Sequence, residues 1–318
     1  MTAGEKTRAL KEWALFTSLA VIFGLAGIFL PWLYFLATLC FPIPVILLVV
    51  RLDSRYGLLG LAAAGLIIIT AIPFQAAALV LIVQYGLLGI LYGLLFKNGV
   101  SSGKSVFIGI AVSVVLAFLS IWLVYAATGQ NPFILDQEGR QAAEQWLAAN
   151  RNSGGLPTEW QGFFMENIIS LFELLLPGQF AVTAAAASAL TYLLARVVLR
   201  RLNFSLPPAI VFTGIYLPWY SIWGLIAGLG LVLAGDFFSW ALAAKAGKNI
   251  LFIFFYAYLI LGLSVAAHFF LRVRLARPVK ILFLFLAFAY IPFSMMLVLL
   301  LGVTDPLVNF RRFPSAKD

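Results

Sequence analysis

The sequence predicts an all-α polytopic membrane protein with about nine transmembrane helices, or eight, and a helical extracytoplasmic insert. Two observations predict this class. Of the 318 residues, 63% are hydrophobic and only 10% are charged, whereas a soluble domain carries roughly 25% charged residues. The apolar residues also form runs of about 20, the length that a helix needs to cross a bilayer. The insert, residues 128–177, is the one long stretch that hydrocarbon would reject.

Each apolar run defines a predicted span, and short turns separate most of them. Pro42 and Pro44 interrupt the second run, and Pro218 lies inside the seventh, where proline removes a backbone donor and kinks a helix. Residues 1–127 therefore hold five spans, 178–304 hold four, and 305–318 form a short tail. The predicted spans lie near 13–30, 33–50, 56–72, 74–96, 104–127, 178–199, 208–234, 249–271 and 280–303.

The distribution of lysine and arginine orients the chain, because cytoplasmic loops carry an excess of both. With the N-terminus in the cytoplasm, the inner loops hold most of the 21 basic residues. The acidic insert then lies outside. One feature disagrees: nine spans place Arg311 and Arg312 outside. If the run 33–50 or the run 280–303 is re-entrant, eight spans remain and the tail is inside. Of these two, only the loss of the last crossing leaves the earlier loops correctly oriented.

The insert is predicted to be a helix, a break and a second helix. Residues 136–150 form the first helix and 151–157 the break, after which Thr158 and Gln161 fit a capping box. The second helix carries three glutamates at seven-residue spacing, close to two turns, so they form one stripe. The stripe is either a solvated face or a funnel for cations. The glutamates are Glu159, Glu166 and Glu173.

Several function classes find no support in the residues. The chain has one cysteine, Cys40, and one histidine, His268, so no disulfide framework, metal site, cofactor site or hydrolytic centre is predicted. The net charge of +9 lies in short loops between apolar runs, which fits topology better than nucleic-acid binding. Residues 99–105 miss the phosphate-binding loop spacing by one position, so ATP-driven work would need a partner.

Polar and aromatic residues near the outer ends of the spans suggest a ligand pocket. Gln84 lies in the middle of a span, where polar residues are costly and informative. An interhelical hydrogen bond for Gln84, and an aromatic belt for the rings, are the simpler explanations. The predicted lining residues are Trp32, Gln75, Gln84, Trp122, Tyr125 and Gln179.

Two stretches resemble an uncharacterised bacterial membrane family called YybS-like. These are Asn249 through Tyr258 to Gly262-Leu263-Ser264-Val265, and Leu301-Gly302 through Asp305-Pro306 to Phe310-Arg311-Arg312. The resemblance covers nearly the whole chain and implies the bacterial inner membrane, but no established activity.

The N-terminal part is similar to the substrate-binding components of energy-coupling factor transporters. Arg8-x-Leu10, Arg55-Tyr56-Gly57 with Gly60 and Gly65, and the small residues of the first helix carry this similarity. It implies six helices around a small-molecule ligand, a membrane coupling protein and an ATPase in trans. Residues Ala14, Ser18, Ala20 and Gly24 would contact the coupling protein, and the insert would form a lid between helices five and six.

Three function classes follow from these patterns. The first is binding and transport of an unknown small molecule by a protein of the lipid bilayer. The second is a scaffold that docks a partner through the insert. The third is a lipid-handling protein, in which inner-loop arginines hold phosphate headgroups; the positive-inside rule explains them equally well. Those arginines are Arg200, Arg201, Arg272, Arg274 and Arg277.

Overall fold

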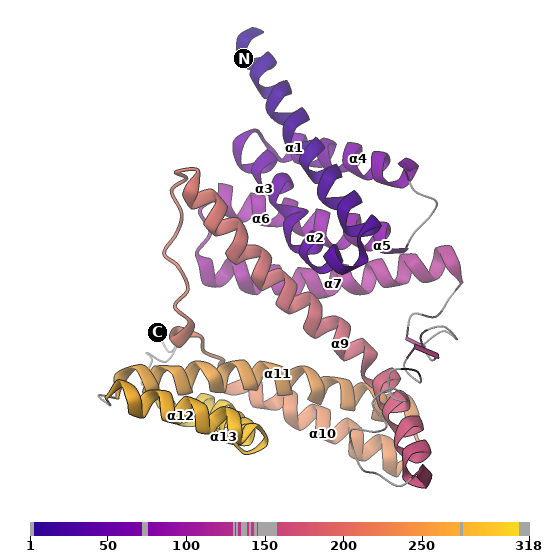
Figure 1. Ribbon diagram of the computed structural model, residues 1–318, viewed down its shortest axis with the longest axis vertical. Coiled ribbons are helices and arrows are strands. Elements are labelled where there is room, and N and C mark those ends of the chain that lie inside the picture. The colour runs from indigo at the N-terminus through magenta and orange to yellow at the C-terminus, as the bar shows by residue number, and fades with distance from the viewer. Residues whose placement is uncertain are drawn as a thin grey trace. The chain divides into compact units, whose positions relative to one another are not determined.

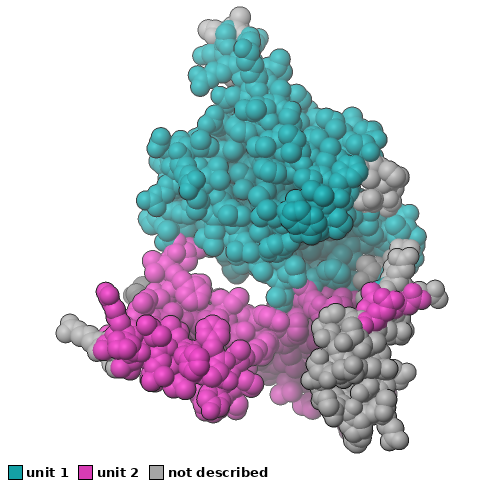
Figure 2. Space-filling view, in the orientation of Figure 1, with its two compact units in different colours: residues 1–139, 180–209 teal, residues 140–179, 210–318 magenta. Residues whose placement is uncertain are grey.

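A computed structural model describes most of the chain as two compact units (Figures 1 and 2). Unit 1 comprises residues 1–139 and 180–209, and unit 2 comprises residues 140–179 and 210–318. The described residues are 3–71, 76–129, 131, 133–134, 139, 141–142, 145, 158–273 and 276–311, without the side chains of 3, 158–166 and 168.

Nine helices within the described ranges are long and apolar enough to cross a membrane. This confirms the prediction of an all-α polytopic membrane protein, in which lipid replaces water as the main solvent of the surface. Helices are the form expected there, because they satisfy their backbone hydrogen bonds within one segment. The nine stretches are Gly4–Phe29, Pro31–Arg51, Ser54–Ala71, Ala76–Lys97, Ser102–Thr128, Ile169–Arg201, Trp219–Phe237, Ala241–Arg272 and Ile291–Val308.

Unit 1 contains the first five of these stretches and residues 180–201 of the sixth. Two are interrupted: the second by a break before Pro42, and the fourth by a π-helical turn. The elements are α1 (Ala3–Phe29), η1 (Pro31–Leu33), α2 (Tyr34–Cys40), α3 (Pro42–Arg51), α4 (Ser54–Ala71), α5 (Ala76–Val80), the π-helix η2 (Leu81–Gly86), α6 (Leu87–Lys97), α7 (Ser102–Thr128) and the second half of α9 (Thr158–Arg201).

Helix α3 lies at the centre of unit 1, where it packs against α1, α4 and α6. Its Val45, Ile46 and Leu48 are fully buried, so these side chains are surrounded by protein and do not face lipid. Glycines of the neighbours permit this approach: Gly57 and Gly93 both face Val49 without an intervening side chain. Close packing through small residues is the usual way that membrane helices associate.

Charged residues gather at one end of the helices of unit 1. Glu12 of α1 pairs with Arg8 at 3.4 Å and with Arg51 of α3 at 3.7 Å. Asp53, just after α3, pairs with Lys97 at the end of α6 at 2.9 Å. These ion pairs place the start of α1 and the ends of α3 and α6 at one side, as the predicted alternation of the first four spans requires.

Unit 2 is built on a hairpin of two long helices, α10 (Ile222–Phe237) and α11 (Ala241–Arg272). The predicted span 208–234 begins too early, because residues 204–218 are mainly extended and contain only the short η4 (Phe212–Gly214). Pro218 therefore does not kink a helix. It precedes η5 (Trp219–Ser221), where its fixed φ and missing N–H are tolerated.

Helix α9 passes through Pro177 without ending, although the sequence predicts a boundary there. The side chain of Asn249 in α11 explains the continuity. Its Oδ1 accepts from the backbone N–H of Gly178 at 2.6 Å, and its Nδ2 donates to the carbonyl of Leu174 at 2.9 Å. A neighbouring amide thus pairs two backbone groups beside the proline, which is how broken helices persist in lipid.

The predicted last span, 280–303, is not one helix. It consists of α12 (Arg277–Ala289) and α13 (Ile291–Val308), which meet at Tyr290. Arg311, just after α13, donates to Ser264 near the C-terminal end of α11. The chain after α13 therefore lies beside α11, and because α13 is itself long and apolar enough to span, the choice between eight and nine crossings stays a prediction.

Several predictions concern residues outside the described part of the chain. These are Gln75, most of the helix 136–150, the break 151–157, Arg274, Arg312, and the side chains of Thr158, Glu159, Gln161 and Glu166. The backbone of α9 begins at Thr158, where the capping box places a helix start.

Candidate functional site

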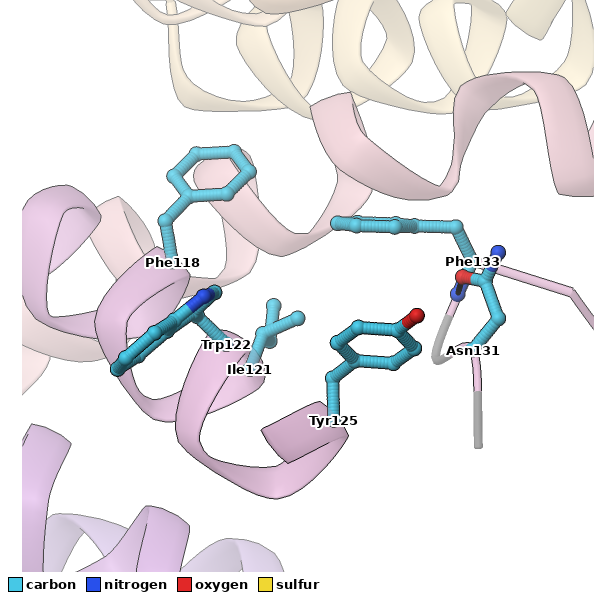
Figure 3. Close-up of a pocket in the computed structure, with 6 residues that line it drawn as sticks. All are labelled: Phe118, Ile121, Trp122, Tyr125, Asn131 and Phe133. Atoms are coloured by element: carbon cyan, nitrogen blue, oxygen red, sulfur yellow. Dashed lines mark hydrogen bonds between the residues drawn. The ribbon is translucent and has the colours of Figure 1, made fainter. Parts of the chain in front are cut away.

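A pocket of about 370 Å³ lies beside the C-terminal part of α7 in unit 1 (Figure 3). Four of its lining residues come from α7 and two from the segment that begins the insert. The lining is aromatic except for one isoleucine and one asparagine. The residues are Phe118, Ile121, Trp122, Tyr125, Asn131 and Phe133.

Helical spacing explains the α7 side of the pocket. Positions 118, 121, 122 and 125 are separated by three or four residues and therefore lie on one face of the helix. Ile121 is buried, while Trp122 and Tyr125 are 61% and 49% exposed. The rings therefore line a recess that is open to a ligand or to lipid.

The opposite side of the pocket is formed by the turn after α7. Gly129 ends this helix in a left-handed conformation (φ 70°), which glycine adopts without steric cost. The side chain of Asn131 then accepts a hydrogen bond from the N–H of Phe133 at 3.0 Å. Phe133 packs edge-on against Phe180 of α9, with the ring centroids 6.1 Å apart. This turn holds Asn131 and Phe133 opposite Tyr125 (Figure 3).

The chemistry of the pocket favours a flat, largely apolar ligand. Aromatic rings provide stacking and edge-on contacts, and the hydroxyl of Tyr125 and the amide of Asn131 provide hydrogen-bonding groups. The volume lies within the range usual for small-molecule sites, roughly 300–1,000 Å³. Among the residues that the structure describes, no charged side chain lines the pocket.

A second polar feature of unit 1 is the π-helix η2. Its wider turn carries Gln84 and Tyr85, both buried. The side chain of Tyr85 interacts with Thr38 and Tyr34 of α2, and the hydroxyl of Tyr34 reaches the carbonyl of Ala77 at 3.4 Å. Single π-helical turns inside helices frequently mark functional sites.

The structure brings together only some of the predicted ligand-binding residues. Trp122 and Tyr125 line the pocket side by side. Gln84 is buried among the helices of unit 1, and Trp32, in η1, is 77% exposed; neither belongs to the pocket lining. Gln179 is assigned to unit 2, and Gln75 lies outside the described residues.

The predicted partner-contact residues divide between two faces of α1. Ala14 and Ser18 are exposed, and the hydroxyl of Ser18 donates to the carbonyl of Ala14 at 2.8 Å. Ala20 and Gly24 are buried instead, with Gly24 against Ile68 and Leu81 of the same unit. Only the first pair is therefore accessible to another protein in this structure.

Sequence reasoning missed Phe118, Ile121, Asn131 and Phe133. A signal for the first two was present, because they share the helical face of Trp122 and Tyr125. No such periodic signal exists for Asn131 and Phe133, whose positions depend on the turn at Gly129. Among the described residues, no group of three or more His, Cys, Asp or Glu side chains could hold a metal ion.

Comparison with known proteins gives a family but no characterised relative. A family model described as "Predicted membrane protein (DUF2232)" matches residues 18–306, which is most of the chain. No curated protein and no solved structure matches the sequence.

Proposed function

We propose that this chain, which belongs to the DUF2232 family of predicted membrane proteins, binds a small molecule in the pocket of unit 1 and takes part in its transport. The observation that carries this proposal is the position of Asn131 and Phe133 across an open recess from Trp122 and Tyr125. An aromatic belt explains rings at a helix end. It does not explain an asparagine and a phenylalanine held opposite them by a defined turn.

The proposed ligand is a small molecule with a flat ring and one or two hydrogen-bonding groups. The rings of Trp122 and Phe133 would cover its faces, and the polar groups of Tyr125 and Asn131 would fix its orientation. An anion is disfavoured, since no basic side chain of the described part of the chain lines the pocket.

Ligand-dependent melting of the purified protein in lipid nanodiscs tests the binding step. We expect a saturable rise in Tm with at least one member of a panel of aromatic vitamins and heterocyclic metabolites. Trp122→Ala and Asn131→Ala should abolish the rise. Trp240→Ala, which removes an exposed ring in unit 2, should preserve it. If no compound raises Tm, or if Trp240→Ala is as damaging as Trp122→Ala, the proposed pocket is wrong.

We further propose that transport depends on a separate coupling protein and ATPase in the bacterial inner membrane, with the insert outside and the N-terminus in the cytoplasm. The exposed face of α1 supports a helix contact, because Ala14 and Ser18 leave room beside the exposed Leu15 and Ile22. Close approach at small residues is typical of membrane helix pairs.

Affinity purification from the native membrane tests this contact. Ser18→Trp should remove any co-purifying membrane protein without lowering the Tm of the chain. Val115→Trp on the exposed face of α7 is the control and should retain the partner. Equal retention in both variants would exclude this face of α1 as the contact.

A further inference from the structure

The side chain of Arg311 is enclosed by oxygen atoms inside unit 2. Its Nη1 donates to the carbonyl of Thr213 and to the hydroxyl of Ser264, both at 2.9 Å. Its Nη2 donates to the carbonyl of Ile215 and to Oδ2 of Asp305, both at 2.7 Å. The Arg311 side chain is 0% exposed and that of Asp305 is 6% exposed. We call these four oxygen atoms the oxygen cradle.

The cradle exists because the chain is extended where it approaches α11. Residues 204–218 lack regular helical pairing apart from η4, so their carbonyls have no donor four residues later. Ser264 donates to the carbonyl of Phe212 at 2.7 Å and can therefore accept from Arg311. Unwound backbone of this kind forms the binding sites of many membrane transporters.

The arrangement of the oxygens matches a guanidinium more closely than a spherical ion. Two oxygens bond to each terminal nitrogen, so the ligands surround two separate points in a planar fork. A metal cation would require its oxygens to converge on a single centre. The cradle therefore has the geometry of a site for a guanidino group.

The charges around the cradle also require a cation. Asp305 is 5% exposed, and its second oxygen, Oδ1, is buried without a hydrogen-bond partner among the described residues. Nε2 of His268, which lies near Asp305 and Arg311, is likewise buried and without a partner there. Without the guanidinium, the carboxylate would remain buried with no bound counter-charge, which is strongly unfavourable.

We propose that the oxygen cradle is a binding site for guanidino cations, and that Arg311 occupies it as a tethered ligand. A free guanidino compound binds in the same place when the Arg311 side chain is removed or withdrawn. The C-terminal turn that carries Arg311 is then released from Thr213 and Ile215. This proposal is independent of the aromatic pocket, because it concerns only residues of unit 2.

Chemical rescue of Arg311→Ala by guanidinium tests the site. The full chain in detergent is melted with millimolar guanidinium chloride or methylguanidinium chloride, and with sodium or potassium chloride at matched ionic strength. We expect Arg311→Ala to lower Tm, and the guanidino salts to restore at least half of the loss in a saturable manner. The sodium and potassium salts should restore little.

Two control variants distinguish the cradle from a general effect of salt. Asp305→Asn combined with Arg311→Ala removes the charged ligand and should show no rescue. Arg277→Ala removes an exposed arginine and should show neither the loss nor the rescue. Equal stabilisation of all variants, or rescue by sodium alone, would overturn the guanidino site.

A second variant covers the case in which Arg311→Ala does not fold. Arg311→Lys keeps a tethered cation but cannot reproduce the planar fork. We expect methylguanidinium to raise its Tm above that in matched sodium chloride, and to slow amide hydrogen exchange around residues 213–215. The absence of both effects would also overturn the proposal.

Discussion

The buried polar side chains of the two units differ in charge, although in both units such side chains also bind carbonyls of non-helical backbone, as Ser102 of unit 1 does at Pro208 (2.6 Å). In unit 1, the buried polar side chains among the described residues are neutral: serines, threonines and Gln84. Ser113, for example, donates to the carbonyl of Ala184 on α9 at 3.0 Å. In unit 2, they include Asn249, which binds backbone groups of α9 beside Pro177. They also include the ion pair of Asp305 with Arg311, whose guanidinium binds the carbonyls of Thr213 and Ile215.

Two kinds of polar contact are present among these side chains. A hydroxyl that bonds to a carbonyl of an intact helix adds a contact to a backbone that is already paired. Such interhelical bonds contribute roughly 0.6 kcal/mol on average. A side chain that replaces a missing backbone partner prevents an unsatisfied group in hydrocarbon, and each such group costs several kcal/mol. We therefore expect the larger effects from substitutions of those unit 2 side chains that replace a missing backbone partner.

The largest effect is expected for Asn249→Leu, which keeps the volume but removes both hydrogen bonds to α9. The N–H of Gly178 and the carbonyl of Leu174 lose their amide partner. We expect a loss of about 3 kcal/mol in the free energy of unfolding, measured by denaturant titration in mixed micelles. Ala246→Leu, at an exposed position of the same helix, is the control. Equal stability of the two variants would mean that α9 pairs its own backbone at Pro177.

The second largest loss of stability is expected where the backbones of α11 and α13 are in contact. A Cβ at Gly302 would collide with the carbonyl of Tyr258, and neither backbone can move aside without displacing its helix. Gly302→Ala should therefore destabilise the protein by about 1–3 kcal/mol, the usual cost of overpacking.

Gly230→Ala is the matched control for Gly302→Ala, because a Cβ added at this position of α10 would meet no atom within 4 Å. It should be neutral or slightly stabilising, since alanine is the better helix former. A comparable loss in both variants would show that helix propensity, rather than the contact with Tyr258, controls the result.

A smaller effect is expected in unit 1 for Tyr92→Phe. The hydroxyl of Tyr92 lies 2.7 Å from that of Ser188 and 3.1 Å from the carbonyl of the same residue. Its loss leaves the backbone of α9 intact, so we expect about 0.6–1.7 kcal/mol of destabilisation. Tyr290→Phe, at an exposed ring, should have no effect in the same unfolding assay. A loss larger than that of Asn249→Leu would reverse the proposed contrast between the units.

The membrane architecture could be predicted from the sequence because span length and hydrophobicity are local properties. The interruptions could not be predicted as readily. Pro177 and Pro218 both follow a leucine, yet α9 continues through the first and α10 begins only after the second. The difference depends on Asn249, which lies about 70 residues away in sequence from Pro177. The choice between eight and nine crossings stays a prediction, since Ile291–Val308 is long and apolar enough to span while Arg311 bonds to Ser264 of α11.

The candidate pocket could be predicted only in part for the same reason. Trp122 and Tyr125 are conspicuous as polar-tipped rings at a predicted helix end. Asn131 and Phe133 join them through the left-handed turn at Gly129 and the contact with Phe180. These are tertiary features that composition and periodicity do not encode.

The exposed ion pair of Asp53 with Lys97 in unit 1 contrasts with the buried ion pair of Asp305 with Arg311 in unit 2. Lys97 donates to Asp53 at 2.9 Å at the surface of unit 1, and this hydrogen bond is the main cause that lowers the pKa of the Asp53 carboxyl. A lowered pKa means that the pair stabilises the folded state above the ordinary pKa of aspartate, and that this contribution is lost as the pH falls through the lowered value. Solvent screens such a pair, so Asp53→Asn should hardly change Tm at neutral pH. The Tm of this variant should also fall slightly less than that of the parent as the pH decreases. Thermal melting of both proteins across the acidic range measures this difference. If Asp53→Asn instead lowers Tm at neutral pH as much as Arg311→Ala does, burial is not what distinguishes the two ion pairs.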